Sequence, residues 1–284
     1  MPPYDTPDTA AIIARALAED LAERGDLTVA ALVPADAEQG VTITAKEDGV
    51  VCGLPLFLHV CEQLAPGTVQ VSEVTEDGRA VRAGDVVLTG QGLASTILIA
   101  ERTALNLAQR LSGVATTAAR YAAAVAGTGA RVLDTRKTTP GLRLLEKHAV
   151  RVGGCHNHRV GLYDQVLIKE NHIALMQQGG PAEAVQRCRE HHGRDAVIEV
   201  EIEALSDLAG VLAAGADIVL LDNFPTADLA AAVAQRGEHR AQLEASGGIT
   251  LDTIRSVAET GVDRISVGAL THSVRALDLS LRCH

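Results

Sequence analysis

Residues 197–223 read VIEVEIEALSDLAGVLAAGADIVLLDN, which predicts a strand, a helix and a second strand in succession. The expected strands are Val197–Glu201 and Ile218–Asp222, and the expected helix is Ser206–Ala214. Short apolar strands joined through a helix are typical of a parallel sheet with right-handed crossovers. The stretch therefore predicts an α/β fold.

The same alternation extends on both sides of this unit, from about Ala130 onward. The other expected strands are Arg131–Asp134, Gln165–Lys169, Gln242–Ala245 and Arg264–Val267, and the other helices are Ala182–His191, Ala227–Arg236 and Leu251–Thr260. Polar or glycine-rich residues follow each strand. In a (β/α) barrel these strand ends converge on one face, where active sites lie, so a closed barrel is favoured over an open sheet.

The residues before Ala130 do not show this alternation of strands and helices. A helix is expected over Thr9–Asp20, with Asp8 as its N-cap. Short β-rich pieces separated by turn residues predict a small α+β domain with an antiparallel sheet: Val41–Lys46, Gly49–Gly53, Val69–Val74 and Val86–Thr89. Two helices follow, Ser95–Gly113 and Thr116–Ala126. Ser112-Gly113 resembles a phosphate loop, but we expect a helix break there.

Composition narrows the functional classes. The formal net charge is −11, which disfavours nucleic acid and anionic membrane surfaces as partners, and aromatic residues make up only 2% of the chain. No apolar stretch is long enough to span a bilayer, and the N-terminus lacks a signal-peptide pattern. The five cysteines form no CxxC pair. We therefore expect a reduced, cytoplasmic protein.

Acidic side chains share one face of the strand 197–201. Glu199 and Glu201 are two residues apart, so both can point into the barrel mouth while Val200 points away. Buried acids need a metal ion, a lysine or a substrate hydroxyl as partner. The alternative is an exposed edge on which one acid is solvated.

Two glycine-containing strand ends suit a phosphate group. They are Ser246-Gly247-Gly248 and Val267-Gly268-Ala269. Glycine lets backbone N–H groups approach an oxyanion, and phosphate sites recur after the last two strands of such barrels. A zinc site at Cys155-His156-Asn157-His158 is not expected, because no second ligand group stands at a recognisable spacing.

Together these motifs resemble the quinolinate phosphoribosyltransferase family, the decarboxylating enzymes that make nicotinate mononucleotide. The resemblance rests on motifs in register over the C-terminal half and just upstream: DTRKTTPGLR at 134–143, Gly153-Gly154, Asn157-His158-Arg159, Gly161-Leu162, LIKENH at 167–172, EVE at 199–201, LDN at 221–223, SVGAL at 266–270, ERTALNL at 101–107 and LSG at 111–113. Cys155 departs from the pattern, because the family usually has a third glycine there.

The resemblance implies two domains and a shared active site. An N-terminal α/β sandwich over 1–110, with the tail 271–284 packed on it, would precede an incomplete barrel of six or seven strands over 111–270. The resemblance also implies a homodimer or higher even oligomer in which the sandwich of one subunit caps the barrel of another. Arg102 would then reach the partner's active site.

The resemblance also implies substrates and residue roles. The reaction joins quinolinate and phosphoribosyl diphosphate, with Mg²⁺ as cofactor. The quinolinate carboxylates would be clamped by Arg102, Arg136, His158, Arg159 and Lys169. Lys137 would serve the ring carboxylate or the diphosphate. Glu201 and Asp222 would hold ribose hydroxyls or Mg²⁺, directly or indirectly, and with Lys137 form the catalytic set. The 5-phosphate would lie on Ser246, Gly247, Gly248, Ser266, Gly268 and Ala269.

Two other functions stay open at this point. A nicotinate phosphoribosyltransferase, or a paralogue acting on another acid, would need a smaller clamp for its single carboxylate. A non-catalytic phosphate sensor could use the same scaffold. Glu201 and Asp222 argue against the sensor, since carboxylates repel a bound phosphate.

Overall fold

The structure is a computed structural model that describes residues 2–176 and 178–284. The chain forms two compact units. The first comprises Met1–Ala119, Thr138–Gly154 and Leu270–His284, and the second comprises Arg120–Lys137 and Cys155–Ala269. The implied domain limits assign residues 111–119, 138–154 and 270 to the barrel, whereas they belong to the first unit.

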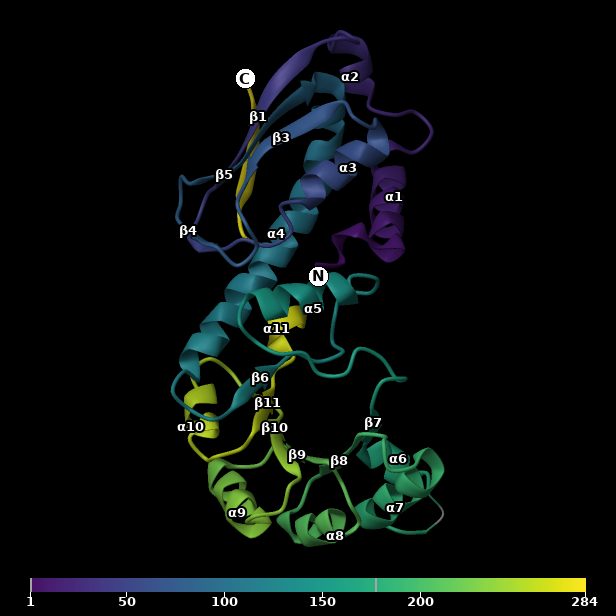
Figure 1. The fold of residues 1–284 in the computed structure, drawn as a ribbon, viewed down its shortest axis with the longest axis vertical. Coiled ribbons are helices and arrows are strands. Elements are labelled where there is room, and N and C mark those ends of the chain that lie inside the picture. Colours follow the sequence, from purple (N-terminus) through teal and green to yellow (C-terminus); the bar gives the residue numbers. More distant parts are fainter. Residues whose placement is uncertain (1, 177) are drawn as a thin grey trace. The chain divides into compact units, whose positions relative to one another are not determined.

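The first unit contains an antiparallel sheet (Figure 1). Its strand order is β12 (Leu279–Cys283), β1 (Glu38–Ala45), β5 (Val86–Leu93) and β3 (Val69–Val74). The short strands β2 (Gly49–Val50) and β4 (Ala80–Val81) pair separately. Val41, Ile43 and Ala45 of β1 are buried while their neighbours are less so, because alternate side chains of a strand face opposite sides of the sheet.

Helices complete the first unit. They are η1 (Pro3–Asp5), α1 (Pro7–Leu21), α2 (Leu27–Leu32), α3 (Leu56–Leu64) and α5 (Arg143–Val152). The expected N-cap of the first long helix was wrong. Thr6, not Asp8, caps α1, because its side-chain oxygen accepts a hydrogen bond from the Thr9 amide at 3.2 Å. Asp8 lies in the first turn, where a carboxylate also favours the helix dipole.

The expected helix break at Ser112-Gly113 is also wrong, since α4 runs without interruption over Ala94–Ala124. Ser112 is fully buried within it, and its hydroxyl accepts a hydrogen bond from the Cys52 amide at 2.9 Å. A Cβ atom at Gly113 would lie 2.3 Å from the carbonyl oxygen of Arg275. This glycine therefore permits close packing of another backbone against the helix and does not end it.

The second unit is built on a six-stranded sheet in which every paired strand is parallel. The order is β6 (Arg131–Leu133), β11 (Arg264–Ser266), β10 (Gln242–Ser246), β9 (Ile218–Asp222), β8 (Ile198–Ile202) and β7 (Val166–Ile168). The helices between strands are α6 (Glu170–Ala174), α7 (Pro181–His192), η2 (Leu205–Asp207), α8 (Leu208–Ala213), α9 (Thr226–Arg236) and α10 (Ile254–Ala258). This arrangement confirms the incomplete α/β barrel (Figure 1).

The chain leaves the sheet through α11 (Ala269–His272). Ile198, Val200 and Ile202 are at most 1% exposed, so β8 carries an apolar row alongside its glutamates. No helix within residues 2–176 and 178–284 combines the length and apolar character that crossing a membrane requires.

Candidate active site

The carboxyl ends of neighbouring strands bring the expected acids to one edge of the parallel sheet. Glu201 lies near the end of β8, and Asp222 is the last residue of the adjacent strand β9. Ser246 ends β10, and Ser266 ends β11. Because parallel strands share a direction, these four residues occupy the same edge, where ligands of such folds bind.

Glu201 is 7% exposed and faces both a cation and other acids. The Lys169 ammonium donates a hydrogen bond to its Oε2. Burial raises the pKa of Glu201, and the hydrogen bond with Glu170 and the charge of Asp222 raise it further, which outweighs the effect of Lys169. Glu201 therefore has Lys169 as a cation partner and lies near a second acid, Asp222.

A tight backbone approach shapes the loop after β10. Gly247 has a φ of +93°, and a Cβ there would lie 2.1 Å from the Asn223 side-chain oxygen. Asn223, itself at a φ of +57°, donates to Asp222 Oδ2 at 2.7 Å. Gly248 follows with a φ of +59°. The glycines thus permit a left-handed turn beside Asp222 that side chains would obstruct.

The 5-phosphate positions stay a prediction. Ser246 is half-buried, Ser266 is 6% exposed, and Gly268 and Ala269 come directly after β11. All of them lie at the same sheet edge as Asp222.

A buried acid, Asp134, links two loops that we call the basic loops: the loop with Arg136 and Lys137, and the loop with Arg159. Asp134 follows β6 and is fully buried, and its carboxylate accepts from Asn157 Nδ2 at 2.6 Å and from the His158 amide at 2.8 Å. This links the loop that carries Arg136 and Lys137 to the loop that carries Arg159. Lys137 is exposed, and its amide donates to Thr135.

Arg136 and Arg159 lie close enough for their charges to interact. Burial lowers the pKa of Arg159, and the charge of Arg136 lowers it further. Among the described residues, no acceptor pairs with the buried Nε of Arg136. Arg159 donates to the carbonyl of Gln165 at 3.1 Å. Guanidinium groups can bind carboxylates through paired hydrogen bonds, so an anion site at Arg136 and Arg159 stays a prediction.

His158 is buried among acids inside the second unit. Its Nε2 lies 3.0 Å from Glu199 Oε2 and 3.4 Å from Glu244 Oε1, and both glutamates are fully buried. Burial opposes its protonation, but the two glutamates outweigh this and raise the pKa of His158 to about 9. Arg264 pairs with Glu244 at 2.6 Å.

The other ring nitrogen of His158 faces the neighbouring arginine. Nδ1 accepts a hydrogen bond from the Arg159 amide at 2.8 Å. A proton on Nδ1 would make this nitrogen a donor. The doubly protonated ring could therefore not accept the hydrogen bond from the Arg159 amide. The position of His158 suits orientation of Arg159 as well as the expected contact with substrate.

Sequence reasoning missed Glu244, Arg264 and Gln165 as partners of this cluster. Gln165 donates to Glu199, which the sequence had placed at the barrel mouth. The available signal was Glu244 itself, a lone acid flanked by Leu243 and Ala245 in an expected strand. An isolated charge within a buried strand requires a partner.

Arg102 belongs to the first unit. It projects from α4 with its side chain 59% exposed, and its guanidinium lies 3.9 Å from Glu101. Its role toward substrate stays a prediction. Within the stretch Cys155–His158, His158 lies with Glu199 and Glu244 in a group of possible metal ligands that the sequence spacing did not indicate.

Comparisons with known proteins point to one family over most of the chain. The quinolinate phosphoribosyl transferase N-terminal domain matches residues 26–112, and the C-terminal domain of the same name matches residues 114–282. The nicotinate-nucleotide pyrophosphorylase [carboxylating] of Mycobacterium leprae is 44% identical over 273 residues, which cover 95% of each chain.

Solved structures give the same result. The nicotinate-nucleotide pyrophosphorylase of Francisella tularensis superposes with a TM-score of 0.91 at 38% identity, covering 99% of this chain and 98% of that one. Human nicotinic acid phosphoribosyltransferase shares the fold alone, with a TM-score of 0.58 and 15% identity over 98% of this chain and 74% of that one.

Proposed function

This chain belongs to the quinolinate phosphoribosyltransferase family, and we propose that it converts quinolinate and phosphoribosyl diphosphate into nicotinate mononucleotide, diphosphate and carbon dioxide. This reaction serves de novo NAD biosynthesis. The observation that carries the proposal is the opposition of two charge groups in the second unit. Arg136 lies near Arg159 and has a buried Nε with no acceptor among the described residues, while Glu201 lies near a second acid, Asp222.

The basic loops suit a dicarboxylate. Each guanidinium can bind a carboxylate through two parallel hydrogen bonds. A bound dicarboxylate would supply the acceptor that Arg136 Nε lacks and offset the burial and the Arg136 charge that lower the pKa of Arg159. Lys137 and Lys169 add charge around this site, and His158 holds the Arg159 backbone.

The acids suit the ribose. As the pyridine nitrogen attacks the anomeric carbon, the bond to diphosphate breaks and positive charge builds on the ribose ring. Carboxylates held beside that charge stabilise the transition state more than the ground state. Glu201 and Asp222 are candidates because both lie at the sheet edge and neither is neutralised by an arginine among the described residues.

The same two carboxylates fit Mg²⁺. Oxygen ligands are those that Mg²⁺ prefers, and a cation would offset the burial and the nearby acids that raise the pKa of Glu201. When bound, Mg²⁺ would neutralise charge on the leaving diphosphate. Glu201 and Asp222 would hold it directly or through water.

Decarboxylation needs no dedicated base. Once the ring nitrogen is quaternary, it stabilises the electron pair left on the ring carbon when the adjacent carboxylate leaves as carbon dioxide. That carbon then takes a proton from solvent. The protein's part is to hold the ring in place, which the basic loops can do. The 5-phosphate would lie against the glycine turn at 246–248 and against residues 266, 268 and 269.

The assembly is part of the proposal. The enzyme would be a homodimer or a higher even oligomer in which Arg102 of one subunit completes the site of another. All five cysteines are free, which suits the reducing cytoplasm.

One assay tests the reaction. The purified protein is incubated with quinolinate, phosphoribosyl diphosphate and Mg²⁺, and nicotinate mononucleotide and carbon dioxide are followed together. We expect both products in equal amounts. A parallel reaction with nicotinate, which lacks the second carboxylate, should be far slower. Faster turnover of nicotinate would favour a nicotinate phosphoribosyltransferase, and binding without product would favour a sensor.

A further inference from the structure

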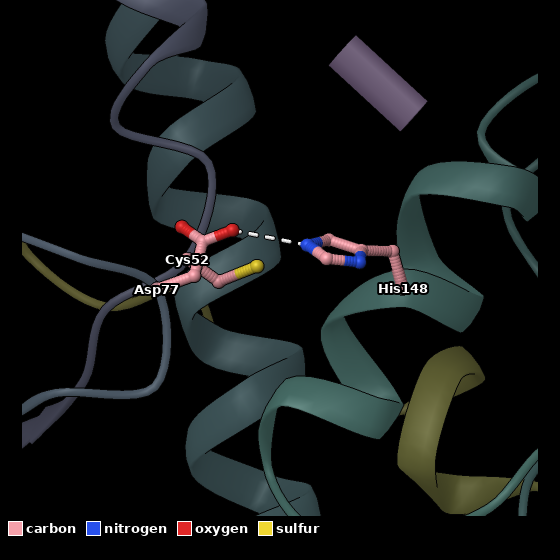
Figure 2. A group of neighbouring side chains, drawn as sticks. All are labelled: Cys52, Asp77 and His148. Carbon is pink, nitrogen blue, oxygen red and sulfur yellow. Dashed lines mark hydrogen bonds and ion pairs between the residues drawn. The ribbon is translucent and has the colours of Figure 1, made fainter. Parts of the chain in front are cut away.

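The first unit contains a buried group of metal-ligand side chains that the proposed reaction does not use. Cys52 lies in the loop between β2 and α3, Asp77 in the turn between β3 and β4, and His148 on α5 (Figure 2). Cys52 is fully buried, and His148 is 8% exposed. Three segments distant in sequence therefore place a thiol, a carboxylate and an imidazole together.

The contacts within this group converge on Asp77. His148 Nε2 lies 3.0 Å from Asp77 Oδ2, and the other carboxylate oxygen accepts from the Gly53 amide at 2.9 Å. The Tyr4 hydroxyl donates to Oδ2 and lies 3.7 Å from the Cys52 sulfur. Figure 2 shows the imidazole directed toward the Asp77 carboxylate, with the Cys52 sulfur beside the line that joins them.

The spacing of the three donors is close to that of a coordination sphere. Cys52 Sγ, a carboxylate oxygen of Asp77 and a ring nitrogen of His148 all lie within 4.8 Å of one another. Tetrahedral zinc with bonds of about 2.0–2.3 Å separates its ligand atoms by roughly 3.3–3.8 Å. Side-chain rotations that shift the donor atoms by up to about one ångström would therefore bring all three within bonding distance of one ion.

The charges also balance. A thiolate and a carboxylate together carry two negative charges, which a divalent cation neutralises when the thiol proton is released to solvent. Coordination would therefore leave no excess charge in this buried group.

We propose that Cys52, Asp77 and His148 form a structural site for a zinc-like divalent transition-metal ion, with Tyr4 beside the fourth position. This proposal is independent of the enzymatic function. Bound metal would join the loop before α3, the β3–β4 turn and α5, and so stabilise the first unit.

Cobalt titration tests the site, because only thiolate ligation gives a sulfur-to-cobalt charge-transfer band in the near ultraviolet. The whole protein is freed of metal with a chelator and titrated with Co²⁺. We expect the band to saturate at one equivalent and to disappear when Zn²⁺ is added. Carboxylate binding of Co²⁺ at Glu201 and Asp222 gives no such band.

Variants separate this cysteine from the others. Cys52→Ser should abolish the band, and His148→Gln should weaken Co²⁺ binding at least about tenfold. Cys61→Ser is the matched control, since Cys61 is equally buried on α3 but belongs to no such ligand group in the described chain, and it should change nothing. Circular dichroism serves as the folding check for each variant.

The proposal is overturned if wild-type protein gives no band at stoichiometric Co²⁺, or if Cys52→Ser retains it. Should Cys52→Ser not fold, His148→Gln decides, and undiminished Co²⁺ affinity in that variant would equally reject the site. A cluster that fails these tests is a hydrogen-bonded contact only.

Discussion

Glu201 is the single residue whose charge matters most to the proposed reaction. It is buried, it contacts Lys169, and its pKa is raised by burial and by neighbouring acids. Glu201→Gln keeps the shape but removes the charge that would stabilise a cationic ribose. Turnover should fall by about 10²–10³-fold with unchanged circular dichroism. Glu203→Gln, an exposed neighbour, is the control, and equal losses in both variants would contradict the assignment.

His158 gives a second prediction at this scale. Its pKa is raised from 6.5 to about 9 in the folded protein because Glu199 and Glu244 surround it. The folded state therefore binds the proton more tightly than the unfolded state does. The resulting stability is complete below pH 6.5 and is lost as pH rises through about 9.

Unfolding free energies of wild type and His158→Gln, measured from pH 6 to 10, test this. The difference between them should shrink as pH rises. A constant difference across the range would show that His158 stays neutral, as its acceptance of the Arg159 amide at Nδ1 would favour.

At the scale of elements, strands were predicted better than helices for a physical reason. The expected strand Ile218–Asp222 agrees with β9 at both ends, because strands buried on both faces are apolar throughout. Helix α5 was not predicted. Its residues Glu146, Lys147 and His148 are buried, whereas periodicity arguments assume that charged side chains face solvent.

The buried charges of α5 depend on partners distant in sequence. Arg110 on α4 pairs with Glu146 at 2.9 Å, and the Thr139 hydroxyl donates to the same carboxylate at 2.7 Å. Likewise, Glu244 and Glu199 meet at His158 only after the barrel has formed. Sequence spacing can place such residues at strand ends but cannot say which of them touch.

Helix α4 provides an element-scale prediction. Alanine is the better helix former, but a Cβ at Gly113 would lie 2.3 Å from the Arg275 carbonyl oxygen. Gly113→Ala should therefore destabilise the protein by about 1–3 kcal/mol in chemical denaturation. Gly210→Ala within α8 is the matched control, because its nearest neighbour would be at an ordinary 3.5 Å. Similar effects of the two changes would contradict the packing role of Gly113.

At the scale of the whole molecule, the prediction concerns whether each active site is built from one chain or from two. Arg102 lies in the first unit on α4, with its side chain 59% exposed, and the acids Glu201 and Asp222 lie in the second. If a partner subunit supplies this arginine, Arg102→Ala and Glu201→Gln damage different parts of a shared site. Each variant alone should then be nearly inactive, while Arg120→Ala, an exposed change on the same helix, should be active.

Hybrid oligomers distinguish a shared site from a self-contained one. Co-expression of Arg102→Ala and Glu201→Gln chains with different affinity tags allows the mixed dimer to be purified. A site built from one barrel and the partner's Arg102 leaves one of the two sites in that dimer intact. The hybrid should therefore recover about half of wild-type turnover. If Arg102 served the barrel of its own chain, every site in the hybrid would carry one defect, and activity would stay at the level of the single variants.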